Sequence, residues 1–228
     1  MSMPYYVSPE QVMKDRADYA RKGIARGRSL AALLCPEGVV VVAENHSRTL
    51  HKVSEIYDRI AFAGVGKYNE FDQLRIAGVR AADLRGYSYS REDVDARSLA
   101  NSYAQMLGQV FTHEMKPLEV EIVVAELGFS ADMTDDRLFH ILYDGTVIDE
   151  EGFTVLGGDA ESVARRLKEA YTPGLARAAA VKAAVGAIGG PDRTISPAEL
   201  EVAELARGDE RRCFRRIEND ELDALLAS

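Results

Sequence analysis

The sequence from residue 29 to residue 44 reads Ser-Leu-Ala-Ala-Leu-Leu-Cys-Pro-Glu-Gly-Val-Val-Val-Val-Ala-Glu. Two apolar runs of strand length flank Pro36-Glu37-Gly38, where proline can set the first corner of a tight turn and glycine can adopt a positive φ at its end. Both runs are apolar almost throughout, so the hairpin that they predict should be covered on both faces. This stretch therefore predicts the central hairpin of a layered domain.

The composition is that of an ordinary globular protein. The 228 residues are enough for one domain with a substantial core. Lys and Arg number 28 against 37 Asp and Glu, a net charge of −9, which argues against a nucleic-acid partner because such proteins need a basic surface. No apolar segment has the length of a membrane span or of a secretory signal, so we expect no membrane partner and a cytoplasmic protein. Cys35 and Cys213 lie in apolar runs and are expected to be buried, unpaired thiols.

An amphipathic helix is predicted before the hairpin, over residues 8–23. Ser8 is a good N-cap, Pro9 suits the first helical position, and Gln11 can complete a capping box. Apolar residues follow at helical spacing as far as Ile24, and charged residues cover much of the remaining surface. The apolar stripe is narrow, so the helix should pack against the sheet of its own domain or against a neighbouring subunit.

The later elements alternate in pairs. Strands are predicted at 52–57, 60–66, 120–127, 138–143, 147–149, 200–206 and 213–217, with an apolar run at 153–156, and helices at 69–84, 90–115, 160–171, 175–188 and from Asn219 onward. Gly86 is expected to close the first of these helices and Pro117 to stop the second, and Asp144-Gly145 favours a type I′ hairpin. Antiparallel hairpins and consecutive helix pairs predict an α+β fold, a four-layer α-β-β-α sandwich of two antiparallel sheets. We expect one domain over 1–228, with the sandwich itself at 28–228.

Common catalytic motifs are missing from the sequence. Gly64-Val65-Gly66-Lys67 differs from a phosphate-binding loop, since Ala61 replaces the first glycine and Tyr68 the Ser or Thr, so its glycines are expected to permit close packing at a strand end. His113-Glu114 lacks the second histidine of a zinc protease, and the four histidines are expected to be surface or capping residues. A serine elbow, a dinucleotide motif and a metal cluster are also missing, so no cofactor and no metal are expected.

Several stretches are similar to one known family. They are residues 4–25, Asp18-Tyr19-Ala20-Arg21 followed by Gly27, Leu33-Leu34-Cys35-Pro36-Glu37-Gly38-Val39-Val40, residues 52–58 and residues 60–66. They resemble the corresponding stretches of proteasome α subunits of the bacterial, actinobacterial branch, and they lack the Tyr-Asp-Arg gate motif of archaeal ones. The resemblance covers nearly the whole chain and implies the N-terminal nucleophile hydrolase fold, which agrees with the predicted sandwich.

The resemblance also implies that this chain has no catalytic residue. Catalytic β subunits of the family use a threonine at the start of the first strand, tuned by an acidic residue and a lysine. The nucleophile position falls at Arg28, while Glu44 and Lys52 fall at or near the other two positions, so a vestigial active-site frame is expected. The alternative is a self-processed hydrolase or β-type subunit that uses Ser29, which would require cleavage after Arg28 and loss of the capped helix.

Lys52 has two interpretations. From the residues alone it is a solvated lysine at a strand start, paired with Glu44 or Asp58 at little gain in stability. The resemblance implies instead that Lys52 lines a pocket between neighbouring α subunits and binds the C-terminal carboxylate of a ring-shaped AAA ATPase. Gly27 and Gly66 match glycines near that pocket, and Lys67 is expected to add positive charge to it.

The first seven residues also have two interpretations. The first residues of many proteins form a frayed terminus, but here Tyr5 and Tyr6 are costly to leave exposed. The resemblance implies that seven chains form a ring that caps the β subunits, and that Met3, Pro4, Tyr5 and Tyr6 of each chain meet at the axis as a gate for unfolded protein substrates. A scaffold without gating is the remaining alternative.

Overall fold

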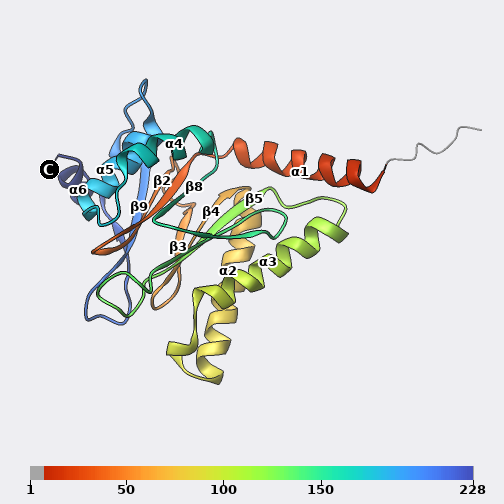
Figure 1. Ribbon diagram of the computed structural model, residues 1–228, viewed down its shortest axis with the longest axis horizontal. Helices are drawn as coiled ribbons and strands as arrows, with labels where there is room; N and C mark the ends of the chain where they lie inside the picture. The colour runs from red at the N-terminus through yellow and green to blue at the C-terminus, as the bar shows by residue number, and fades with distance from the viewer. Residues whose placement is uncertain (1–7, 228) are drawn as a thin grey trace, which may run out of the picture.

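The computed structural model describes residues 8–227 and consists of two sheets between helical layers (Figure 1). The strands are β1 (Leu30–Cys35), β2 (Gly38–Glu44), β3 (Val53–Tyr57), β4 (Ile60–Gly66), β5 (Val120–Glu126), β6 (Arg137–Ile141), β7 (Val147–Glu150), β8 (Phe153–Leu156), β9 (Leu200–Ala206) and β10 (Phe214–Ile217). The helices are α1 (Pro9–Ala25), α2 (Tyr68–Ser88), α3 (Ala96–His113), α4 (Ala160–Ala170), α5 (Arg177–Gly189) and α6 (Asn219–Ala227).

Each sheet has five strands, and all neighbouring strands are antiparallel. The first sheet has the order β10-β9-β2-β1-β8 and the second the order β3-β4-β5-β6-β7. Helices α2 and α3 pack on the outer face of the second sheet, and α4, α5 and α6 pack on the outer face of the first. The four-layer α-β-β-α sandwich predicted from the order of elements is therefore confirmed.

The β1–β2 hairpin is buried along its whole length, as its apolar sequence predicts. Alternate residues of β1 face the core between the sheets, such as Leu30, or the helices α4 and α5, such as Leu33. Gly38 has φ 139°, and a Cβ there would overlap the carbonyl oxygen of Leu205 in β9. Glycine is therefore required where the turn meets the neighbouring strand.

Helix α1 buries apolar residues in its own sandwich only in its C-terminal half, and Arg16 near its middle donates to Val110 O at the end of α3. Ala20 and Ile24 are buried in the core between the sheets, whereas Val12 and Met13 are exposed. The backbone N–H of Gln11 donates to Ser8 Oγ at 3.2 Å, which confirms the predicted N-cap, and the helix ends at Ala25 rather than near Gly23. Among residues 8–227, no helix is both long and apolar enough to cross a membrane.

The predicted boundaries of α2 and α3 were wrong in two places. Helix α2 continues through Gly86 to Ser88. A Cβ at Gly86 would overlap Tyr57 Oη, so this glycine serves close packing rather than helix termination. Helix α3 begins at Ala96 with Asp95 as its N-cap, while Ser90 caps a separate 3₁₀ turn at Arg91–Asp93. It ends at His113, ahead of Pro117.

The predicted type I′ turn at Asp144-Gly145 is also wrong. That turn requires positive φ at both central residues, and Met133 is the only non-glycine residue of the described chain with positive φ. Instead Gly145 N donates to Leu142 O at 3.0 Å, and Gly145, with φ 87°, closes a longer loop. A Cβ at Gly145 would overlap Ala104 O, so the loop conformation is fixed by close packing on α3.

Cys35 and Cys213 are buried and unpaired, as predicted, but His140 contradicts the expectation that all four histidines are surface or capping residues. His140 lies on β6 and is buried between the sheets. Its Nε2 lies 3.4 Å from Glu121 Oε2, and its Nδ1 lies 3.6 Å from Glu150 Oε1. Burial lowers the pKa of His140, but the two carboxylates outweigh burial and raise its pKa above the ordinary value.

The stability contribution of His140 should depend on pH. Because its folded-state pKa is raised, the contribution is fully present below the unfolded pKa of about 6.5 and is lost as pH rises through the folded-state pKa. His140→Gln should therefore lower the melting temperature clearly at a pH of about 6 and much less at about 9. The quantity to compare is the melting temperature of the variant minus that of the wild type in the same buffer, so the effects of other titrating groups cancel. A difference that is constant or grows with pH would contradict the ion-paired histidine.

Candidate functional site

Four chain segments meet where the sandwich joins α1. They are the residues before β1 (Gly27 and Arg28), the end of β2 (Glu44), the residue before β3 (Lys52) and the end of β4 (Gly66). A Cβ on Gly27 would lie 3.3 Å from Gly66 N, so the two glycine backbones are in close approach. The structure thus brings together the residues of the expected active-site frame and the two glycines of the expected docking pocket, and we call this group the Lys52 site.

Lys52 is directed at the backbone of the segment before β1. Its Nζ donates to Arg28 O at 2.8 Å, and its backbone N–H donates to Glu201 Oε2 at 2.8 Å. Burial lowers the pKa of Lys52 to about 8, although Glu201 and Glu44 act in the opposite direction. The site therefore holds an ammonium whose charge is easily lost and which retains N–H groups for another acceptor.

The solvated ion pair expected for Lys52 from the residues alone does not form. Neither Glu44 nor Asp58 pairs with Lys52 in the described part of the chain. Glu44 binds the guanidiniums of Arg28 and Arg193, and Asp58 lies at the opposite end of β3, paired with Arg91.

Glu44 is the buried acid of the site, with 3% of its surface exposed. Arg193 binds it through two hydrogen bonds of 2.7 and 2.8 Å, and Arg28 Nη1 contacts the same carboxylate. Burial raises the pKa of Glu44, but the two guanidiniums outweigh burial and keep its pKa below the ordinary value. Glu44 is thus a structural anion that holds the Arg28 side chain.

The position before the first strand carries no free nucleophile. Arg28 occupies it, and the side chain is held by Glu44. Ser29 is buried, and its Oγ donates to Gly157 O at 3.3 Å. As long as α1 stays joined to β1, neither residue has the free α-amino group on which this type of catalysis depends.

Lys67 is paired with a second buried acid, Glu119. Its Nζ lies 2.6 Å from Glu119 Oε2, and Lys116 Nζ lies 3.0 Å from the same oxygen. Burial raises the pKa of Glu119, but the two lysines outweigh it and lower the pKa. The positive charge that the sequence predicted from Lys67 is therefore offset by Glu119.

The glycine-rich stretch at 64–67 serves packing, as the sequence predicted. A Cβ at Gly64 would lie 2.9 Å from the Phe71 ring, and one at Gly66 would overlap Glu119 O. Gly66 also has φ 108°, which side chains rarely tolerate. These contacts hold β4 against β5 and the start of α2.

Three partners of the site were not found from the sequence. Arg193 comes from the loop after α5, and nothing in its neighbourhood marks it as a partner of Glu44. Glu201 and Glu119 gave a weak signal, because each is an acidic residue beside an apolar strand sequence. The proposed gate residues Met3, Pro4, Tyr5 and Tyr6 lie outside the described residues.

The fold and the site together define a four-layer sandwich of two antiparallel sheets in which Arg28 precedes the first strand and is held by Glu44. A family model described as "Proteasome subunit" matches residues 24–204. The chain is 63% identical over 226 residues to the proteasome subunit alpha of Acidimicrobium ferrooxidans, and the aligned region covers 99% of this chain and 97% of that protein. It is 59% identical over 233 residues to that of Sanguibacter keddieii, with 100% of this chain and 91% of the relative covered. It is 56% identical over 237 residues to that of Kineococcus radiotolerans, with 100% of this chain and 99% of the relative covered. The chain belongs to the proteasome subunit family, and within it to the α subunits of the actinobacterial type.

Proposed function

We propose that this chain is a non-catalytic subunit that forms the outer, seven-membered ring of a 20S proteasome, gates substrate passage and docks a regulatory ATPase. The observation that supports this most is the contact of Arg28 with both Glu44 and Lys52, because the resemblance implies that these three residues occupy the nucleophile, acid and lysine positions of a hydrolase. The named relatives are α subunits, and the family is one of ring-forming proteolytic particles. The work of the subunit in the cytoplasm is then to control access to chemistry carried by β subunits.

The docking role rests on the geometry around Lys52. A terminal carboxylate that reaches Lys52 would accept from an ammonium that already binds Arg28 O, and Gly27 and Gly66, which lie in close approach, add no side chain of their own to the site. In a ring, the neighbouring subunit would complete the pocket. The partner is a ring-shaped AAA ATPase that presents its C-terminal tail.

The gating role rests on the placement of α1. The helix leaves the sandwich at the Lys52 site, and its N-terminal end at Pro9 lies far from that site (Figure 1). The first turns of α1 are thus its least packed part, since Val12 and Met13 are exposed. Tails of this length from seven subunits can meet at a ring axis, where Tyr5 and Tyr6 would pack on one another.

Removal of residues 2–7 tests the gate. The truncated chain, assembled with its β subunit, should hydrolyse a small peptide several times faster than the full-length particle, because the axial opening is no longer closed. Particle size by gel filtration controls for assembly. An unchanged peptide rate would favour a scaffold without gating.

Intact mass separates this proposal from a hydrolase processed at Ser29. The mature subunit in the particle should retain α1, and a chain that begins at Ser29 would contradict a non-catalytic α subunit. The mass is measured on the co-expressed particle, where processing has its best opportunity.

A further inference from the structure

An open groove lies between one face of α1 and the segment that follows α3. We call it the α1 groove, and it is lined by Val12, Asp15, Arg16, Tyr19, Met115, Lys116 and Pro117. Its volume is about 560 Å³, within the range of roughly 300–1,000 Å³ that is typical of binding pockets. Figure 1 shows the C-terminal end of α3 beside this part of α1. The groove begins one turn after Ser8, where α1 starts.

The exposed wall of the α1 groove is apolar. Val12, Tyr19 and Met115 are 39%, 46% and 99% exposed. Val12 and Tyr19 lie seven residues apart and therefore on the same face of the helix. Together with Pro117 they form an apolar strip of the kind that marks a binding surface. Covering this strip would contribute on the order of 25 cal/mol for each Å² of apolar surface removed from water.

Two of the charged side chains in the α1 groove are already paired within the chain. Asp15 accepts a hydrogen bond from Gln11 Nε2 at 2.7 Å. Lys116 Nζ lies 2.6 Å from Glu70 Oε1 and 3.0 Å from Glu119 Oε2. A charged occupant would have to compete with these partners, so the groove favours an uncharged one.

Arg16 leaves one buried donor of the α1 groove without a partner. Its Nη2 donates to Val110 O at 3.1 Å and also contacts Glu114 O, so the guanidinium holds the end of α3. Its Nε is buried and has no hydrogen-bond partner among residues 8–227. A guanidinium N–H can only donate, and leaving it unpaired in a buried place is costly. An occupant that brings a carbonyl or hydroxyl oxygen would remove this cost.

We propose that residues 3–7 of the same chain, Met-Pro-Tyr-Tyr-Val, bind in the α1 groove when the gate is open. These residues lie outside the described part of the chain, carry no charge and directly precede Ser8. The axis of α1 rises about 16 Å from Ser8 to Tyr19, and five residues of extended chain span about 17 Å, so the segment can turn back along the helix. Its covalent link to α1 gives it an effective concentration of about millimolar, which a separate partner lacks.

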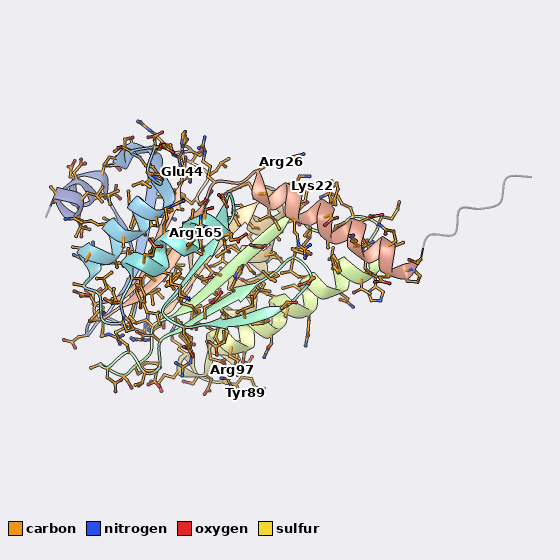
Figure 2. All side chains as sticks on the ribbon, turned by 45° about the horizontal axis from the view of Figure 1, so that its top comes forward. Lys22, Arg26, Glu44, Tyr89, Arg97 and Arg165 are labelled. Carbon is orange, nitrogen blue, oxygen red and sulfur yellow. The ribbon has the colours of Figure 1, made fainter. Side chains whose placement is uncertain are left out.

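The proposal rests on the proposed function, because that function supplies the closed state in which seven such segments meet at the ring axis. The α1 groove supplies the second state, in which each segment lies against its own subunit and its apolar side chains remain covered. A partner that favours one of two such states shifts the equilibrium between them. Figure 2 shows the labelled Glu44, of the Lys52 site, near the Arg26 end of α1, whereas the first turns of the helix extend away from it. A docked ATPase tail would therefore leave the groove free.

An engineered disulfide tests the open position. Tyr5→Cys with Met115→Cys is assembled with the β subunit and oxidised with glutathione disulfide, and the natural cysteines are buried. Mass spectrometry of the unreduced digest should find the two residues linked within one chain, and the particle should hydrolyse a small peptide as fast as one that lacks residues 2–7. Reduction should return the rate to that of Tyr5→Cys alone. Tyr5→Cys with Lys168→Cys, at an exposed position of α4, is the control and should form no such link.

A variant of the groove itself shows whether it acts through the N-terminal segment. Val12→Glu places a charge in the apolar strip at an exposed position, so the melting temperature should not change. ATPase-stimulated peptide hydrolysis should fall at least about fivefold in the full-length chain, because the open state is disfavoured, and should not change in the chain that lacks residues 2–7. Val12→Ile keeps the apolar surface and should behave like the wild type. An equal fall with and without residues 2–7 would contradict the proposal.

The outcomes separate this proposal from the proposed function. If removal of residues 2–7 does not accelerate peptide hydrolysis, the gating role itself fails. If removal accelerates hydrolysis but the oxidised double-cysteine particle is no faster than Tyr5→Cys alone, only the binding of residues 3–7 in the α1 groove is refuted. A disulfide that joins two different chains would also overturn it, because the groove would then hold the segment of a neighbouring subunit.

Discussion

Replacing Lys52 with alanine is expected to leave the α–β particle intact and to lower ATPase-stimulated protein degradation at least tenfold. A charge-assisted hydrogen bond to a carboxylate contributes roughly 1.5–3 kcal/mol, and each 1.4 kcal/mol is a factor of about ten in affinity. Assembly should survive because, among the described residues, the Lys52 side chain binds only the backbone carbonyl of Arg28, whereas Glu44 is held by two arginines. The measurement is degradation of an unfolded protein with and without the ATPase. Lys168→Ala, at an exposed position of α4, is the matched control and should be stimulated normally.

The same docking should weaken as pH rises. Because burial lowers the pKa of Lys52 to about 8, its ammonium loses its charge as pH passes through that value. Stimulation of degradation by the ATPase should therefore fall as the pH rises through about 8. Peptide hydrolysis by the particle that lacks residues 2–7 is the control, because it measures the effects of pH on the particle that do not involve docking. Equal stimulation of wild type and Lys52→Ala at neutral pH would refute the docking role.

The fold was largely predictable because its strongest signals are local. The β1–β2 hairpin is apolar on both faces, and burial of every residue from Leu30 to Cys35 follows from that pattern. Ser8 and Pro9 mark the start of α1 by capping chemistry that acts within four residues. Hairpins and helix pairs in this order leave few ways to bury all their apolar faces, and the sandwich is one of them.

The failures share a physical cause, which is that long-range packing overrides local propensity. Gly86 looked like a helix terminator, yet its missing side chain makes room for Tyr57 from β3. Gly145 is required in its loop because a Cβ there would overlap Ala104 O of α3. His140 is buried because two acids from other strands compensate it, and a single sequence does not show that the three converge.

The candidate site was predictable in its members but not in its connections. Arg28, Glu44 and Lys52 were identified together through the resemblance, and the structure places them in contact. Arg193 is 149 residues from Glu44 in sequence and yet supplies two of its hydrogen bonds. Such a partner follows only from the crossing of the loop after α5 over the end of β2.

Replacing Gly66 with alanine should be among the most destabilising single changes in this chain. Gly66 has φ 108°, a conformation that costs a side-chain-bearing residue about 1–3 kcal/mol, and its new Cβ would overlap the carbonyl oxygen of Glu119. That carbonyl accepts the backbone N–H of Lys67 at 3.0 Å, so it cannot retreat without loss of a hydrogen bond. Together these effects should cost roughly 3–5 kcal/mol, a fall in melting temperature of about 10 °C for a chain of this length.

Gly186→Ala is the matched control, because it is the same substitution with the opposite expected sign. Gly186 lies within α5, and a Cβ there would meet nothing within 4 Å. Alanine should therefore stabilise the helix by about 0.4–1 kcal/mol through the lower conformational entropy of the unfolded chain. Thermal unfolding of both variants beside the wild type gives the comparison, and a Gly66→Ala protein that melts within about 2 °C of the wild type would contradict the predicted strain. Because the Gly66 backbone lies against Gly27, the surviving fraction of this variant should also lose stimulation by the ATPase, as Lys52→Ala does, whereas Gly186→Ala should keep it.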